Sequence, residues 1–502
     1  MTDNVVTSPL SDILIPPDIA DKVHLNRSAP PAFYYSANDR QNVAIQALVR
    51  QLSDTANISA RPLPLDEIHA LNKGIGTSNI LNLTRPQIQV VDLFREAVKR
   101  KASDIHLRVG EDGVTIVKFR IHGELFKMEH LTMSKEDGEN LASTIILSMC
   151  DVTEAQFNSN RPQDGRIKQA YLAGLNLYSA RYAHTPTVDG IVAVMRLVND
   201  DSGNPPGLDE LGFLPEQQTL LRKILAYPEG VVILSGPTGS GKSTTLRTLS
   251  SMYLAMHNYQ RNLVTYEDPP EGHIVGAIQC PIIADKNNPD DVLRAWRLYL
   301  SNTLRIDPDA ILVGEMRDAF SAQACITNGM TGHIVLATQH ANDPINILER
   351  MLTMDVRPEL LSDPQLFIGL ASQRLVQTLC PHCAQQWEQV ACELEPDLRA
   401  LLEKECDTDQ LRFRHREGCP ECDNGVNGRS VVAEIIHPDA RFMKIYRTEG
   451  KLAARAYWTH HLSGISRNAH VMKLIQAGRV DPRSASSVCP LDEDRRLSEE
   501  VA

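Results

Sequence analysis

The apolar and polar positions change their spacing several times along the chain, and each change marks a different kind of structure. Over residues 84–98, apolar residues recur at helical spacing behind a threonine that can cap and an early proline, which predicts a helix of about fifteen residues. Residues 105–109 and 114–121 are typical of strands joined by a glycine-bounded turn. These elements predict an α+β domain over residues 84–198.

The regions on either side of this domain have different patterns. Prolines interrupt residues 1–83, where only 42–52 has helical spacing, so we interpret this part as an N-terminal extension with partial order. Residues 199–207 combine turn-forming and charged residues, a composition typical of a flexible interdomain linker. From residue 208 to 502, strand-like and helical stretches alternate, which predicts an α/β domain with a doubly wound sheet.

A glycine-rich turn follows the apolar run at residues 231–234 and precedes a helical pattern. This is the context of a phosphate-binding loop, in which backbone N–H groups and a helix N-terminus bind phosphate oxygens. Lys242 would reach the β and γ phosphates of a nucleoside triphosphate, and Ser243 would give its hydroxyl to Mg²⁺. A chance glycine turn is the alternative. The residues expected to bind the nucleotide here are Gly236, Pro237, Thr238, Gly239, Ser240, Gly241, Lys242, Ser243 and Thr244.

Two acidic segments stand at the ends of later apolar runs. Glu315 follows residues 311–313, where a parallel sheet presents its active site, and we expect it to polarise the water that attacks the nucleotide. Glu267, Asp268 and Glu271 follow another apolar run and can organise Mg²⁺ and its waters, because hard cations take oxygen ligands. The alternatives are an ordinary surface glutamate for the first segment and a solvated turn for the second.

Two histidines flank a further apolar run. His333 precedes residues 334–339 and His340 follows them, so the pair can sense the γ phosphate. A single histidine is more often structural, and that interpretation stays open for each.

Four cysteines form two Cys-x-x-Cys pairs separated by 35 residues, namely Cys380, Cys383, Cys419 and Cys422. Four thiolates suit tetrahedral Zn²⁺, and a complete set of protein ligands leaves no open position, so the predicted zinc is structural. Two redox dithiols or disulfides are the alternatives.

Composition narrows the class of protein. With 42% hydrophobic and 23% charged residues in 502, and no apolar stretch of about 20 residues, the sequence favours a multidomain protein without a membrane span. The N-terminus lacks the basic and apolar regions of a secretory signal, so we expect a cytoplasmic protein with reduced thiols. A net charge of −12 argues against nucleic acid as a partner.

The order of these segments resembles the secretion and type IV pilus ATPases of the type II secretion superfamily, over about residues 86–428. The phosphate loop resembles their Walker A motif, residues 267–271 their Asp box, 311–315 their Walker B motif and 332–340 their His box. The resemblance implies a RecA-like ATPase domain over 208–502 that includes a tetracysteine module at 379–430. It implies a PAS-like N-terminal domain before the 199–207 linker.

Signatures of that N-terminal domain resemble Ser103-Asp104-Ile105-His106 and Gln163-Asp164-Gly165-Arg166. Arg181 and Arg196 fall where the family supplies arginines to phosphates, and a pair of surface arginines is the alternative. Arg374, in a further family-like segment, is a candidate to face nucleotide or a neighbouring subunit. The sequence departs from the family at Gln339-His340-Ala341, where Leu-His-Thr is usual, and at Ile191-Val192, where a Glu-Arg pair is common.

The function implied by the resemblance is that of a homo-hexameric ATPase, peripheral at the inner membrane, that acts on a platform protein there and drives pilin or pseudopilin assembly. The tetracysteine insert favours assembly over retraction and over the traffic ATPases of type IV secretion, which generally lack it. A nucleotide-binding switch that does not hydrolyse ATP is the alternative from another class. Retention of the acidic, histidine and arginine positions argues against such a switch.

Overall fold

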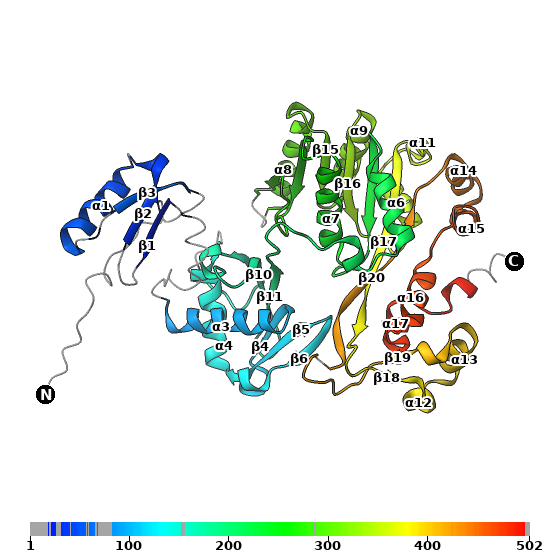
Figure 1. Ribbon diagram of the computed structural model, residues 1–502, viewed down its shortest axis with the longest axis horizontal. Coiled ribbons are helices and arrows are strands. Elements are labelled where there is room, and N and C mark those ends of the chain that lie inside the picture. The colour runs from blue at the N-terminus through cyan, green and yellow to red at the C-terminus, as the bar shows by residue number, and fades with distance from the viewer. Residues whose placement is uncertain are drawn as a thin grey trace. The chain divides into compact units, whose positions relative to one another are not determined.

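The computed structural model describes residues 19, 22–26, 32–40, 42–56, 58, 60–65, 68, 83–151, 156–284, 288–422 and 424–496. The chain divides into two compact units, Met1–Ile88 and Gln89–Ala502 (Figure 1).

The described residues of the first unit form a small sheet with one helix. The sheet has the order β1 (Val23–Asn26), β2 (Ala32–Ser36), β3 (Ala60–Leu63), and the helix is α1 (Val43–Ala56). Phe33, Ile45 and Leu52 are fully buried in a common core, which is why α1 can pack on the sheet. The helix predicted within 42–52 is confirmed, and the described residues have more regular structure than the proline-rich composition indicated.

Helix α3 (Arg85–Lys99) includes the boundary between the two units and confirms the fifteen-residue helix predicted at this place. The backbone N–H of Thr84 donates to the Gln87 side chain at 2.9 Å, which satisfies one free donor at the start of the helix. The helix buries Val90, Phe94 and Ala97 against the sheet that follows.

That sheet is antiparallel and has the order β6-β5-β4-β11-β10-β9-β8, with β7 paired to β5. The strands at 105–109 and 114–121 are confirmed as parts of β4 and β5. With α3 and α4 (Lys135–Thr144), the sheet forms the α+β domain. Its strands are β4 (Ala102–Val109), β5 (Val114–Ile121), β6 (Glu124–Lys127), β7 (Met133–Ser134), β8 (Cys150–Asp151), β9 (Gln163–Ile167), β10 (Leu177–Pro186) and β11 (Ile191–Asn199).

A second, seven-stranded sheet has the order β14-β13-β15-β16-β12-β17-β20. Every neighbouring pair is parallel except β17 and β20, so the carboxyl ends of β12, β13, β15 and β16 meet at one edge. The strands are β12 (Gly230–Ser235), β13 (Leu263–Glu267), β14 (Ala277–Pro281), β15 (Ala310–Val313), β16 (Ile334–Gln339), β17 (Phe367–Leu379) and β20 (Val426–Ile436).

Helices cover both faces of this sheet, as Figure 1 shows for α7 and α9. Val231 and Ile233 of β12 belong to one hydrophobic cluster, whereas Val232 and Leu234 belong to the other. A strand buried on both faces is continuously apolar, which explains the run at 231–234. This arrangement confirms the predicted α/β domain, in which helices cover both faces of the sheet. Its helices here are α6 (Pro215–Leu225) and α7 (Lys242–Met256) on one face, and α8 (Pro289–Asn302), α9 (Ala319–Met330) and α10 (Ile345–Thr353) on the other.

The segment between β17 and β20 carries the four cysteines on loops that extend from these two long strands. It contains α12 (Trp387–Val390), α13 (Pro396–Glu405) and a short pairing of β18 (Gln385–Gln386) with β19 (Arg412–Phe413). Shorter and C-terminal helices complete the domain, namely α5 (Leu208–Leu211), α11 (Pro358–Leu361), α14 (Ala440–Glu449), α15 (Lys451–His461), α16 (Arg467–Gln476) and α17 (Pro482–Val488). Among the described residues, no helix is both long and apolar enough to cross a membrane.

Residues 199–207, predicted to be a flexible linker, form a hydrogen-bonded turn. The backbone N–H of Asp200 donates to the carbonyl of Asn176 at 2.9 Å, and the Asp201 carboxylate pairs with Arg247 of α7. Aspartate oxygens in the linker also accept N–H groups two residues further on. The same residue types that indicated flexibility form such turns, so composition alone did not separate the two outcomes.

Candidate functional site

A cavity of about 1150 Å³ lies where the carboxyl ends of the parallel strands face the α+β domain. Most of the residues that sequence analysis selected for ATP and Mg²⁺ converge on its wall, although they come from both domains. Those that line it are Thr238, Gly239, Ser240, Gly241, Lys242, Ser243, Thr244, Glu267, Asp268, Glu271, Glu315, His340, Arg181 and Arg196.

The phosphate loop joins β12 to α7, and its shape requires glycine. At Gly236, φ is 147°, and a β-carbon there would stand 2.4 Å from the carbonyl oxygen of Gln373. Gly241, with φ 82°, is the N-cap of α7, so the positive end of that helix points at the cavity. The backbone therefore holds the form that binds phosphate groups.

Lys242 is the first residue of α7, and its ammonium group folds back over the loop. Its Nζ donates to the carbonyls of Gly236 at 2.8 Å and Pro237 at 3.1 Å. Burial lowers the pKa of Lys242, and the carboxylates of Glu315 and Glu271 oppose that effect. The two carboxylates thus favour the charged ammonium, which is the form that binds phosphate.

Glu315 follows β15 at the edge of the cavity. Its Oε1 lies 3.1 Å from Nε2 of His340, and its Oε2 lies 2.8 Å from Nη2 of Arg317. The two contacts fix the carboxylate between an imidazole and a guanidinium. This orientation is suited to accepting a hydrogen bond from a water beside the phosphate loop.

The two predicted histidines lie at opposite ends of β16, which corrects the expectation that both face the phosphates. His340 follows the carboxyl end and contacts Glu315. His333 precedes the strand, accepts through its carbonyl the N–H of Gly230 and places Nδ1 3.1 Å from the carbonyl of Asn328. It is not among the described residues that line the cavity. Since a strand rises about 3.3 Å per residue, the two histidines are separated by the length of the six-residue strand β16.

The acidic segment after β13 supplies one buried and two more accessible carboxylates. Glu267 accepts hydrogen bonds from Thr265 at 2.7 Å and Gln279 at 3.3 Å. Burial raises the pKa of its carboxyl group, and these two hydrogen bonds oppose that effect. Asp268 and Glu271 line the cavity beside it. Ser243 and Glu315 line the same cavity, and hydroxyl and carboxylate oxygens are the ligand types that Mg²⁺ takes.

Arg181 and Arg196 reach the cavity from the α+β domain. They stand directly opposite each other on β10 and β11, so their side chains project from the same face of that sheet. Nη2 of Arg181 lies 3.5 Å from the Glu271 carboxylate. Nε of Arg196 lies 3.0 Å from the carboxylate of Asp104 in β4. The pair is therefore aimed into the cavity, and Asp104 gives the family-like signature Ser103–His106 a role in holding Arg196.

Several lining residues were not selected from the sequence. Lys101, Arg120 and Arg429 add positive charge to the wall. The position of Arg120 could have been predicted from the sequence, because Arg120 lies opposite Asp104 in the pairing of β4 with β5 and is on the same side of the sheet. Arg429 lies far along the chain on β20, and no local spacing indicates its position. Arg374, a candidate for nucleotide contact, instead donates to the carbonyl of Val488 at 3.0 Å.

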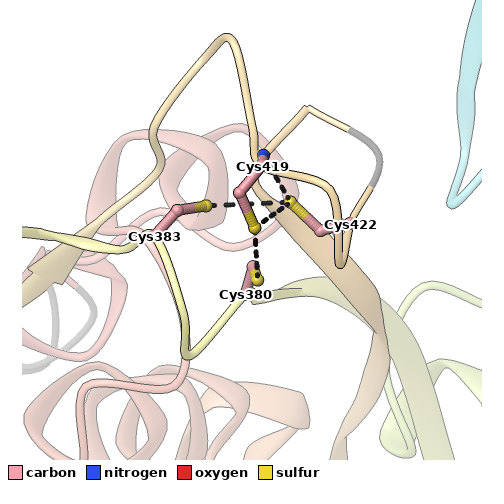
Figure 2. A group of neighbouring side chains, drawn as sticks. All are labelled: Cys380, Cys383, Cys419 and Cys422. Carbon is pink, nitrogen blue, oxygen red and sulfur yellow. Dashed lines mark hydrogen bonds between the residues drawn. The ribbon is translucent and has the colours of Figure 1, made fainter.

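The four cysteines converge on one point although they come from two separate loops (Figure 2). Their Sγ atoms lie within 4.8 Å of one another, and the closest pairs are 3.6, 3.7 and 3.8 Å apart. A tetrahedral ion with Zn–S bonds of about 2.3 Å requires sulfurs about 3.8 Å apart, whereas a disulfide bond is about 2.05 Å. All ten cysteines are free thiols. The cluster therefore fits a structural zinc ion and does not fit two disulfides.

A parallel sheet with a phosphate loop at its carboxyl edge, and an acidic residue after another strand of the same sheet, defines a P-loop ATPase fold. The chain belongs to the family described as type II/IV secretion system protein, whose sequence model matches residues 84–480.

Named relatives agree with this assignment. The chain is 32% identical over 367 residues to the type II secretion system ATPase E of Vibrio cholerae, covering 72% of this chain and 68% of that protein. It is 33% identical over 356 residues to the type IV pilus assembly ATPase PilB of Myxococcus xanthus, covering 70% of this chain and 58% of that protein.

Among solved structures, the pilus retraction motor PilT with bound ADP is similar at a TM-score of 0.52 and 21% identity, over 81% of this chain and 98% of that one. The Legionella pneumophila ATPase DotB has the same TM-score at 20% identity, over 80% and 95%. These similarities establish a shared fold.

Proposed function

We propose that this protein is an ATP-hydrolysing motor that drives assembly of a type IV pilus or of the pseudopilus of a type II secretion system. The observation that carries the proposal is the shared cavity. Lys242, Ser243 and Glu315 from the α/β domain and Arg181 and Arg196 from the α+β domain line the same space. Hydrolysis in this cavity would replace ATP by ADP and phosphate at a place that residues of both domains line.

The chemistry follows from the positions of the side chains. The loop N–H groups and Lys242 bind the phosphates, and the Glu315 carboxylate, fixed by His340, orients the attacking water. Ser243 with the carboxylates of Glu267 and Asp268 would hold Mg²⁺ and its waters. When bound, that ion neutralises charge on the β and γ phosphates. Each group acts by positioning or by charge, which is the usual basis of phosphoryl transfer.

Motion would come from the arginines. Arg181 and Arg196 bind the γ phosphate while it is present, and after hydrolysis they return to Glu271 and Asp104, their partners in this structure. The α+β domain, which we propose is PAS-like, would thereby move against the ATPase domain. By analogy with the family, the working form is a homo-hexamer bound peripherally at the inner membrane through a platform protein. We propose no role for nucleic acid.

The tetracysteine cluster supports assembly over retraction, because the resemblance associates this insert with assembly and secretion motors. Relatives with names in both of those classes match the chain at 32% and 33% identity. A retraction motor or a traffic ATPase shares the fold, and a switch without hydrolysis would share the ATP site, so these remain outcomes of the test.

The test is ATP turnover by the purified chain in Mg²⁺, with its mass measured by light scattering. Glu315→Gln should bind ATP as the parent does and lose turnover by at least about a hundredfold, since it keeps the shape of the side chain and removes the charge. Lys242→Ala should lose ATP affinity and turnover together. Tight ATP binding without turnover, with or without platform protein, would identify a switch instead.

A further inference from the structure

Gln373 lies in β17 beside the point where β12 passes into the phosphate loop. In register, Ser235 at the end of β12 faces Ser372, so Gln373 is the next residue along. Its side chain is completely buried, and its Nε2 donates to the carbonyl of Ser240 at 2.7 Å. This hydrogen bond joins the crest of the loop to a strand 133 residues away in the sequence.

The bond fixes the direction of one peptide group. In a planar trans peptide the C=O of one residue and the N–H of the next point in opposite directions. Because the C=O of Ser240 is held toward β17, the N–H of Gly241 points away from β17, and Gly241 is one of the residues that line the cavity. Gly241 has φ 82°, a conformation that other residues rarely adopt, and the N–H of this residue belongs to the first turn of α7.

The same residue supports the beginning of the loop. Its backbone carbonyl oxygen lies 2.4 Å from the position that a β-carbon of Gly236 would take. Gln373 therefore contacts the loop at two points, through its main chain at Gly236 and through its side chain at Ser240. An amide is suited to this task because it donates without carrying a charge that would compete with Lys242 for phosphate.

We propose that Gln373 is a positioning residue that keeps the phosphate loop in its anion-binding form by donating to the carbonyl of Ser240. The proposal rests on the ATPase function proposed above and deepens it, since Gln373 is not among the described residues that line the cavity and would act through the loop. The segment that contains it was noted in the sequence for Arg374, whose guanidinium points instead to the carbonyl of Val488.

Gln373→Met tests the proposal, because methionine has a similar length and lacks the donor. Gln217 provides the matched control. It is also buried, its Nε2 donates to the carbonyl of Ala433 at the same 2.7 Å, and it is not among the described residues that line the cavity. The measurements are the Kd for a non-hydrolysable ATP analogue with Mg²⁺, the KM and kcat of turnover, and the midpoint of thermal unfolding.

Losing one loop-orienting hydrogen bond should raise the Kd and KM of Gln373→Met about tenfold and leave kcat within about twofold. Gln217→Met should lower the midpoint of thermal unfolding by about as much as Gln373→Met does, and it should leave the Kd within about twofold of the parent value. A Kd for Gln373→Met within twofold of the parent, or an equal rise in both variants, overturns the proposal. Failure of the parent chain to bind the analogue would instead overturn the proposed function.

Gln373→Glu gives a second readout that does not depend on the methionine variant. At pH 8 its carboxylate would face the Ser240 carbonyl and repel it, so the Kd should rise by more than tenfold relative to the parent. At pH 5.5 a protonated carboxyl can donate as the amide does, and the ratio of the two Kd values should fall by at least about threefold. A ratio that is the same at both pH values contradicts the proposed hydrogen bond.

Discussion

The guanidinium of Arg414 donates two hydrogen bonds, of 2.7 and 2.9 Å, to the carboxylate of Glu124. Arg414 precedes the second cysteine pair, and Glu124 begins β6 of the α+β domain. Beside this pair, Gln377 donates to the carbonyl of His122 at 3.0 Å. His122 and Gly123 line the nucleotide cavity, so Gln377 of β17 and Arg414 of the tetracysteine segment hold a turn that forms part of its wall.

The Arg414–Glu124 pair should contribute measurably to stability. Arg414 holds the pKa of the Glu124 carboxyl below its usual range, and the two side chains are 17% and 43% exposed. Allowing for solvent screening, a cycle of Arg414→Met with Glu124→Gln should give a coupling energy of about 1 kcal/mol in thermal unfolding. The exposed pair Arg399–Glu403 within α13 is the control, with about 0.4 kcal/mol expected. Equal coupling in both cycles would contradict a special role for the interdomain pair.

Removing one cysteine of the cluster should release the metal. Cys419→Ser takes one of four sulfurs, and because structural zinc binding stabilises the fold around it, the purified variant should contain little zinc and unfold at a lower temperature. Zinc is counted by elemental analysis against protein concentration. Cys392→Ser, at an exposed cysteine outside the cluster, should keep one zinc per chain. An unchanged zinc content in Cys419→Ser would rule out the four-sulfur site.

The chain should lose stability in mild acid because of His470. Its Nδ1 accepts the N–H of Ala433 and its Nε2 lies 3.1 Å from the carbonyl of Gly212, so the neutral ring is fully hydrogen-bonded. Burial lowers its pKa to about 4, below the value of about 6.5 in the unfolded chain.

Between those two pH values the unfolded chain binds a proton that the native ring does not, so stability falls as pH falls. The loss should reach on the order of 3 kcal/mol at pH 4. Denaturant unfolding from pH 7 to 4 measures it. His470→Asn should be less stable at pH 7 and have a shallower pH dependence, and replacement of the exposed His461 should leave the slope unchanged. An equally steep slope for His470→Asn would assign the effect to other groups.

The arginines of the α+β domain should act on turnover more than on folding. Burial lowers the pKa of Arg181, yet a guanidinium stays protonated at any working pH. Replacing it with glutamine should reduce kcat on the order of a hundredfold, because charge that develops on the γ phosphate loses a partner. Arg95→Gln, at an exposed position on α3, serves as the control. Parent-like turnover by Arg181→Gln would show that Arg181 takes no part in hydrolysis.

The elements of the ATP site could be predicted from the sequence because their signals are local. The apolar run at 231–234 reflects burial on both faces of the sheet, and the glycines of the loop reflect backbone conformations that only glycine tolerates. The direction of the chain through β16 could also be predicted from the sequence. Phosphates bind where strands end, so His340 could be placed near them, and His333, which precedes its strand, could be placed away from them.

Other contacts depend on how distant segments meet. The order of the strands in the large sheet brings Gln373 beside Ser240, and no spacing in the sequence indicates that pairing. The contact of Arg181 with Glu271 requires the two domains to face each other. The Asp, Ser and Gly residues of the linker are common both in flexible chains and in tight turns, so composition did not distinguish the two. The turn depends on contacts with Asn176 and Arg247, which lie elsewhere in the sequence.

The two anchors in the linker have a mechanical consequence. Asp200 is tied to the α+β domain through Asn176, and the very next residue, Asp201, is tied to α7 through Arg247. Two adjacent linker residues are therefore tied to different domains. Arg247 lies about 7.5 Å along the axis of α7 from Lys242, so the linker is attached to the helix that carries the phosphate-loop lysine, about one and a half turns away from it.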